Sequence, residues 1–237
     1  MPPKESSKPE TLILAEPRAF PEDIFTEPTD VDPDTLANLG PLRRLAGSWQ
    51  SAAGADVNPK ADGPERRQYI EHSVLEPIDP QANGPQLFYG LRYHTHITTA
   101  EEDITFHDQV GYWLWEPATG LVLQSLTIPR GQAVLAAGHA APSDDRLVLT
   151  AKRGRTDHGI SSTEFLEYAF RTEDYRIEVT FNSDGSWTYV SETTLLVRGQ
   201  EGPFNHRDTN RLVKVGEPQP NPLMRILAAR QARPTAG

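Results

Sequence analysis

Short segments that alternate between apolar and polar residues follow one another along most of this chain, and they constrain its fold more than any other feature. A period of two places successive side chains on opposite faces, as in a half-buried β-strand. Turn-forming residues separate the segments, most plainly Asp184-Gly185, where glycine allows the positive φ of a tight hairpin. The alternating segments are residues 67–78, 86–99, 104–117, 120–129, 131–141, 146–153, 175–182, 187–199 and 210–215.

No crossover helix separates these segments, so consecutive strands are expected to pair as antiparallel hairpins. Residues 164–172 (EFLEYAFRT) fit a helix as well as a strand, and with them the count is about ten strands. A sheet that closes on itself leaves no exposed edge. The sequence therefore predicts an all-β fold, an antiparallel up-and-down β-barrel with short flanking helices.

The two ends of the chain differ from this barrel region. Residues 1–33 are rich in Pro, Glu, Asp and Ser without apolar periodicity, which predicts a flexible N-terminal arm. Three apolar residues in the arm are candidates for docking on the domain: Phe20, Ile24 and Phe25. Asp34 is placed to cap a helix of one or two turns, and the tail NPLMRILAARQA predicts a helix with Pro222 in its first turn. The expected division is an arm (1–33), a β-barrel region (34–216) and a C-terminal tail (217–237).

Composition excludes several classes of protein. The 237 residues include 33 acidic and 23 basic ones, and a formal net charge of −10 disfavours a nucleic-acid partner. There is no apolar run of about 18 residues, and MPPKESSKPE lacks the apolar part of a secretory signal. We therefore expect a cytoplasmic protein with no membrane partner. The absence of cysteine excludes disulfides, thiolate ligands and a cysteine nucleophile. The oligomeric state stays open.

Histidines are the main candidates for chemistry. His94 and His96 are two residues apart, so both point to one face of a strand, and His107 on the next strand is a conceivable third ligand, with Asp108 pointing away. A divalent-metal site is one interpretation, and hydrogen-bonded histidines on an outer face or a wet rim are the other. No G-x-S-x-G motif and no glycine-rich phosphate loop accompanies them. His206 lies at a loop-to-strand junction, where it either caps the loop or faces a ligand.

Five short motifs stand in an order that is similar to one known family. They are LAGSWQSAAG (45–54), YIEH (69–72), FHDQVGYWLW (106–115), IPRGQ (128–132) and FNHRDTNRLVKV (204–215). Together they resemble the nitrobindin family, haem-binding β-barrels whose fold is similar to that of fatty-acid-binding proteins and lipocalins. The resemblance covers about residues 36–215.

Individual positions match the family pattern unevenly. The opening Gly-x-Trp-x-Gly-x-Gly of the family matches at Gly47 and Trp49, whereas Ser51 and Ala53 stand where the family has glycine. A histidine followed by a Gly-Tyr pair also recurs in the family, and the matching residues are His107, Gly111 and Tyr112.

The resemblance implies a cofactor and a site. The family's proximal haem ligand is a histidine near the last strand, and His206 matches it, which implies haem b with His206 as the axial iron ligand. Asp208, two residues on, is a candidate partner for the second ring nitrogen. On the distal side, the turn TIPRGQ would contribute Ile128, Pro129 and Gly131.

The function implied is nitric oxide binding at ferrous haem, or isomerisation of peroxynitrite to nitrate at ferric haem, so the chain is a candidate haem-dependent peroxynitrite isomerase. The alternative is a haem-free carrier of a fatty acid or other small apolar ligand, motivated by Ser51 and Ala53. An inward arginine would then take the carboxylate, and the candidates are Arg92, Arg130 and Arg211.

Overall fold

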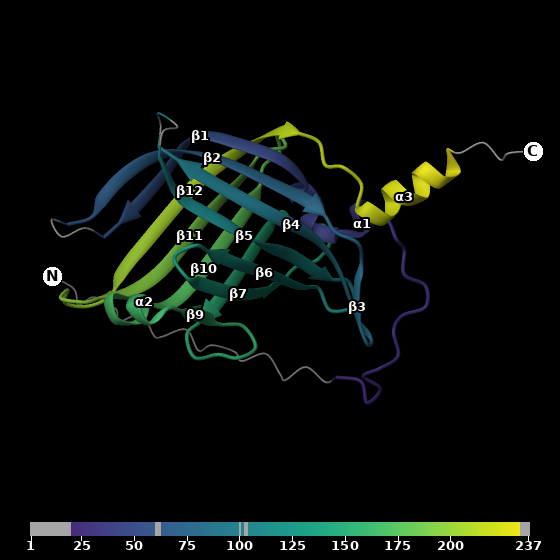
Figure 1. Ribbon diagram of the computed structural model, residues 1–237, viewed down its shortest axis with the longest axis horizontal. Coiled ribbons are helices and arrows are strands. Elements are labelled where there is room, and N and C mark those ends of the chain that lie inside the picture. Colours follow the sequence, from purple (N-terminus) through teal and green to yellow (C-terminus); the bar gives the residue numbers. More distant parts are fainter. Residues whose placement is uncertain (1–19, 60–62, 100, 102–103, 233–237) are drawn as a thin grey trace, which may run out of the picture.

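The computed structural model describes residues 20–59, 63–99, 101 and 104–232, apart from the side chains at positions 52, 53, 58 and 67. Within this part of the chain, ten strands curve into a closed wall (Figure 1). The wall strands are β1 (Gly47–Asn58), β2 (Glu65–Pro77), β4 (Gln86–Thr98), β5 (Thr105–Glu116), β6 (Leu121–Ile128), β7 (Gln132–His139), β8 (Arg146–Lys152), β10 (Phe170–Phe181), β11 (Trp187–Val197) and β12 (Phe204–Gly216).

Antiparallel pairing joins every wall strand to its neighbours. β1 pairs with β2 on one side and with β12 on the other, and a further pairing between β2 and β4 closes the ring. Two short strands add to single wall strands without taking part in closure: β3 (Gln81–Asn83) pairs with β4, and β9 (Ile160–Ser162) pairs with β7. The predicted all-β antiparallel barrel of about ten strands is confirmed.

The β10–β11 hairpin shows how the sequence produces these strands. Tyr175, Ile177 and Val179 are buried in the barrel, while the residues between them face outward. Gly185 has φ +83° in the connecting turn, a conformation that a side chain would strain, and Trp187 then pairs with Phe181 across the hairpin. Residues 164–172, which fit a helix as well as a strand by sequence, contain both. The helix α2 (Glu164–Ala169) runs directly into the strand β10.

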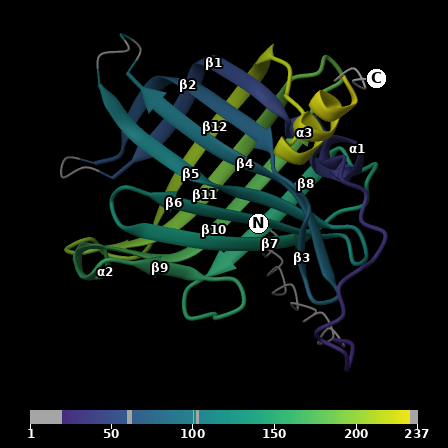
Figure 2. The same cartoon turned by 45° about the vertical axis from the view of Figure 1, so that its right-hand side comes forward.

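Short helices lie at the two ends of the barrel (Figures 1 and 2). At one end, Asp34 caps α1 (Thr35–Asn38) by accepting a hydrogen bond from the Ala37 amide, as predicted. The 3₁₀ helix η1 (Gly40–Leu45) follows, and it buries Leu42 and Leu45 completely. α3 (Pro222–Gln231) lies at this end with Pro222 in its first turn, and α2 lies at the other end. No helix in the described ranges is long and apolar enough to span a membrane.

The N-terminal arm docks differently from the prediction. Phe20, Ile24 and Phe25 are 70%, 58% and 84% exposed, so the expectation that these side chains dock on the domain is wrong. Backbone contacts hold the described part of the arm instead: Tyr89 donates its hydroxyl hydrogen to the Asp32 carbonyl at 3.1 Å. Backbone carbonyl and amide groups can hold a segment against a barrel by hydrogen bonds, without burial of its apolar side chains.

Candidate functional site

The barrel interior contains a cavity of about 440 Å³ that reaches the end where α2 lies. Leu166 of α2 and Phe170 at the start of β10 line it there, together with His206 of β12. This volume falls within the range of about 300–1,000 Å³ that is usual for small-molecule sites. We call the end of the cavity beside α2 the mouth.

His206 lines the cavity and is held by a carboxylate from the neighbouring strand. Its Nε2 atom lies 2.7 Å from Oδ1 of Asp56 on β1, and the two side chains are 33% and 12% exposed. The expected partner was Asp208, so the assignment of the carboxylate is corrected to Asp56. Asp208 does point into the same cavity, but its oxygens are occupied by tyrosine hydroxyls. The β1–β12 pairing places Asp56 opposite Asp208, two residues along β12 from His206, and from there its carboxylate reaches the ring.

Deeper in the barrel, two carboxyl groups and two tyrosines form one network. Tyr69 donates a short hydrogen bond to Asp208, and its oxygen lies 2.9 Å from the Tyr189 hydroxyl. Glu71 accepts from Tyr189 at 2.9 Å and from Asn210 at 2.7 Å. Burial raises the pKa of Asp208 to about 7, and burial also raises the pKa of Glu71. Both effects arise because a low-dielectric interior disfavours the charged form.

The hydrogens available in this network favour a neutral Asp208. Tyr189 has one hydroxyl hydrogen and lies within bonding distance of both Glu71, at 2.9 Å, and Asp208, at 3.1 Å. If Glu71 receives that hydrogen, the contact between Tyr189 and Asp208 needs a hydrogen from the Asp208 carboxyl. A protonated Asp208 supplies it, in agreement with its raised pKa.

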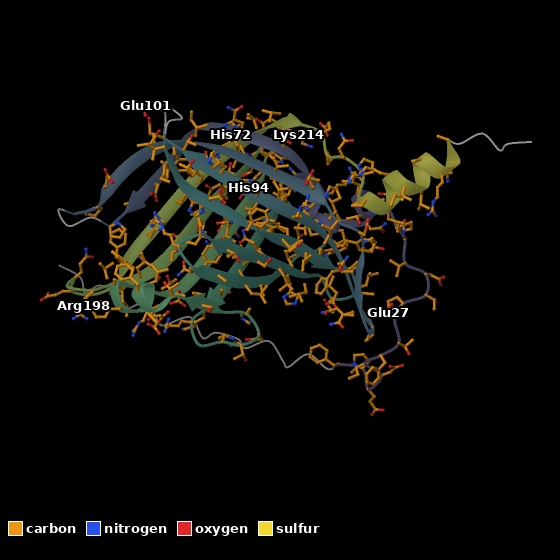
Figure 3. All side chains as sticks on the ribbon, in the orientation of Figure 1. Glu27, His72, His94, Glu101, Arg198 and Lys214 are labelled. Atoms are coloured by element: carbon orange, nitrogen blue, oxygen red, sulfur yellow. The ribbon has the colours of Figure 1, made fainter. Side chains whose placement is uncertain are left out.

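The three histidines considered as metal ligands lie on opposite faces of the wall. His107 lines the cavity, and its Nε2 atom lies 3.2 Å from Oε1 of Gln109. His94 is exposed on the outside of β4 (Figure 3), 3.1 Å from Asp108. A shared site of His94, His96 and His107 is therefore wrong, and Asp108 faces the same side as His94. The described residues contain no group of three or more His, Cys, Asp or Glu that could hold a metal ion.

Burial lowers the pKa of His107, and the positive charge of Arg130 acts in the same direction. A hydrogen-bond relay also fixes its tautomer, because Gln109 donates its amide hydrogen to Tyr93 at 2.6 Å and turns its oxygen toward His107. His107 is thus a neutral imidazole whose Nε2 hydrogen is already in use.

The β6–β7 turn, residues 128–132, sits at the mouth. Ile128 lines the cavity, as do Arg130 and Gln132 of the same turn. Pro129 and Gly131 lie between them in the turn and are exposed, and neither belongs to the cavity lining. Their contribution is to the shape of the turn, since Gly131 has φ +79° and its amide bonds the Ile128 carbonyl at 3.0 Å.

Several lining residues were not predicted from the sequence, notably Asp56 and the network of Tyr69, Glu71 and Tyr189. A signal for part of this network was present, because the alternation in residues 67–78 puts Tyr69 and Glu71 on one face. No sequence signal pointed to Asp56, because β1 is rich in Ala, Gly and Ser and does not alternate between apolar and polar residues.

Comparison with known proteins agrees with this geometry. A family model described as a THAP4-like, heme-binding β-barrel domain matches residues 38–214. The chain belongs to this family. The resemblance to nitrobindins is therefore confirmed. The crystal structure of Rv2717c from M. tuberculosis superposes with a TM-score of 0.52 at 21% identity, over 78% of this chain and 99% of that chain. At this identity the likeness shows the fold alone. No curated protein sequence matches the chain.

The residues at the mouth of this nitrobindin barrel fit a haem. His206 offers a ring nitrogen, because its hydrogen bond to Asp56 uses Nε2 and not Nδ1. Apolar side chains line the same cavity and suit a macrocycle: Ile97, Phe106, Ile128, Leu166, Phe170 and Leu195. A carboxylate on a ligand histidine fixes the ring and raises its basicity, an arrangement usual in metal sites.

The two departures from the glycine pattern lie in β1. Ser51 is buried and its hydroxyl bonds the Asn210 side chain at 2.5 Å, which joins it to the carboxyl network. The side chain of Ala53 is not among those described. Gly54 follows them in β1, and a Cβ there would lie 2.0 Å from the Tyr69 ring, so the close packing of this tyrosine depends on it.

Proposed function

We propose that this nitrobindin-family chain binds haem b at the barrel mouth through His206, and that it binds nitric oxide or isomerises peroxynitrite to nitrate there. The observation that carries the proposal is the His206–Asp56 pair at 2.7 Å, set at the opening of a cavity with apolar walls. When bound, haem supplies an iron that binds nitric oxide in the ferrous state and converts peroxynitrite in the ferric state.

The chain's own residues would hold and shield the reactants. Asp56 would keep the His206 ring oriented by accepting its N–H, which leaves the other ring nitrogen to hold the iron. Peroxynitrite and nitrate have the same atoms and charge, so isomerisation needs no net proton transfer. This suits a mouth where His107 is neutral and its Nε2 hydrogen is bound to Gln109. We include a cytoplasmic location in the proposal, because a chain without cysteine has no disulfide that requires an oxidising compartment.

The experiment is replacement of the axial ligand followed by its restoration. His206→Gly should lose the haem spectrum of the wild type, and added imidazole should restore it by filling the space left by the ring. Stopped-flow mixing of the loaded wild type with peroxynitrite should then give nitrate as the product. A His206→Gly variant that keeps the wild-type spectrum without imidazole would refute the assignment, and His94→Gly on the outer face is the matched control.

A second candidate function is a haem-free carrier of an apolar molecule with a carboxylate. It is favoured by one observation, that an arginine, Arg130, lines a largely apolar mouth. Native mass spectrometry of the purified protein separates the two functions, because a haem mass supports the first and a lipid mass supports the second.

A further inference from the structure

Of the three arginines considered for an inward role, the structure selects one. Arg92 pairs with Glu76 at 2.7 Å, and Arg211 pairs with Asp184, both in exposed positions. Arg130 lines the cavity instead. Within the described part of the chain, its guanidinium has no hydrogen bond, ion pair or ring contact.

The turn that carries Arg130 is fixed in place against the segment that leads into α2. The Thr163 amide bonds the Gly131 carbonyl at 3.0 Å, and a Cβ on Gly131 would lie only 2.3 Å from the Thr163 side chain. Glycine is therefore needed at position 131 both for its positive φ and for the close approach of the Thr163 side chain. Pro129 fixes its own φ and the Thr163 hydrogen bond holds Gly131, so a constrained backbone presents Arg130 at the mouth.

The carboxyl groups that line the cavity with Arg130 already have hydrogen-bond partners. Of the carboxyl groups that line the cavity, Asp56 is bonded to His206, and both Glu71 and Asp208 accept hydrogen bonds deeper in the barrel. The other arginines near α2 are also engaged: Arg153 pairs with Glu167, Arg171 with Glu173, and Arg198 (Figure 3) stacks on Tyr168 at 4.0 Å. Arg130 is thus a cation with its donors available beside an apolar opening.

We infer that Arg130 anchors a carboxylate of the bound ligand at the mouth, so that the site takes an amphipathic molecule with an apolar body inside and an acid group at the rim. The inference rests on the proposed ligand site and adds the class of ligand, which must carry a carboxylate. Guanidinium binds carboxylate through two parallel hydrogen bonds, and this geometry is stronger and more directional than a lysine contact. A haem propionate and a fatty-acid headgroup both supply this chemistry.

The test compares ligands with and without the acid group. Haemin and its dimethyl ester are titrated by absorbance into wild type, Arg130→Gln, and Arg225→Gln as a control with equal charge loss on the exposed surface of α3. Arg130→Gln should weaken haemin binding about fivefold, as expected for an exposed ion pair of up to about 1 kcal/mol. It should leave the affinity for the dimethyl ester unchanged, and the Arg225→Gln variant should match the wild type with both ligands.

Equal effects of Arg130→Gln on both ligands, or no effect on either, would overturn the inference. If the wild type binds no haemin, the proposed haem function fails, and a fluorescent long-chain fatty acid and its methyl ester replace the two haemins. A selective loss of acid binding in Arg130→Gln then still supports the anchor. No difference between acid and ester in that series overturns it.

Discussion

Replacing Asp208 with asparagine should make the apo-protein more stable at neutral pH and leave it nearly unchanged in acid. The carboxyl is buried, and its pKa in the folded protein is raised to about 7, mainly by burial. Asparagine has a similar shape and mimics the neutral carboxyl, because its oxygen accepts from Tyr69 and its amide donates to Tyr189. The variant therefore removes the titration and keeps the hydrogen bonds.

The sign and the size follow from the two protonation states. In the unfolded chain the carboxyl loses its proton near pH 3.8, whereas the folded protein holds it until about pH 7. Between these values the folded state binds more protons, so the free energy of unfolding of the wild type falls as pH rises. The difference between 3.8 and about 7 corresponds to at most about 4 kcal/mol, since each tenfold step is about 1.4 kcal/mol.

Urea unfolding of wild type and Asp208→Asn at intervals from pH 4 to pH 8 measures this effect. The free energies should nearly coincide at pH 4 and separate up to pH 7, with a gain of up to about 10 °C in Tm for the variant at neutral pH. Asp184→Asn is the control of opposite sign, because hydrogen bonds from Ser186 lower the pKa of Asp184 in the folded protein. Curves for Asp208→Asn that run parallel to the wild type across this range would refute the reasoning.

Substitutions at three other residues test the structure. Glu71→Ala should lower the free energy of unfolding by about 3 kcal/mol in urea titrations, because it removes a buried acceptor shared by three donors, and Glu71→Gln should lose less. Gly111→Ala should cost about 2 kcal/mol, since its Cβ would lie 2.0 Å from the Ser125 carbonyl oxygen; an unchanged Tm would contradict this. Arg153→Gln removes the ion pair that holds α2 through Glu167, so haem transfer to apomyoglobin should be about threefold faster, and an unchanged rate would show that α2 does not restrain the mouth.

Strand alternation was sufficient to predict the barrel but not the inside of its wall. A period of two shows that His94 and His96 share a face, yet it does not show whether that face is inside. The interior face of β4 carries Tyr93, Thr95 and Ile97, which puts His94 outside and His107 of the next strand inside. The assignment of faces depends on the whole ring of pairings, and a single segment does not contain it.

The partner of His206 could not be found from the sequence for a related reason. Asp56 and His206 are 150 residues apart, and only the pairing of the first and last wall strands, β1 and β12, brings them together. The prediction chose Asp208 because it is close in sequence and on the same face, which is a sound local argument. Tyr69 and Tyr189 compete for that carboxyl, and they come from two other strands.

Haem titration of wild type, His206→Ala and His94→Ala, followed at the Soret band, tests the central claim most directly. A saturable Soret shift is expected in the wild type and in His94→Ala, whose ring lies on the outer face. The same shift should be lost in His206→Ala. Equal affinity and an identical spectrum in His206→Ala would contradict the proposal that this histidine holds the iron at the barrel mouth.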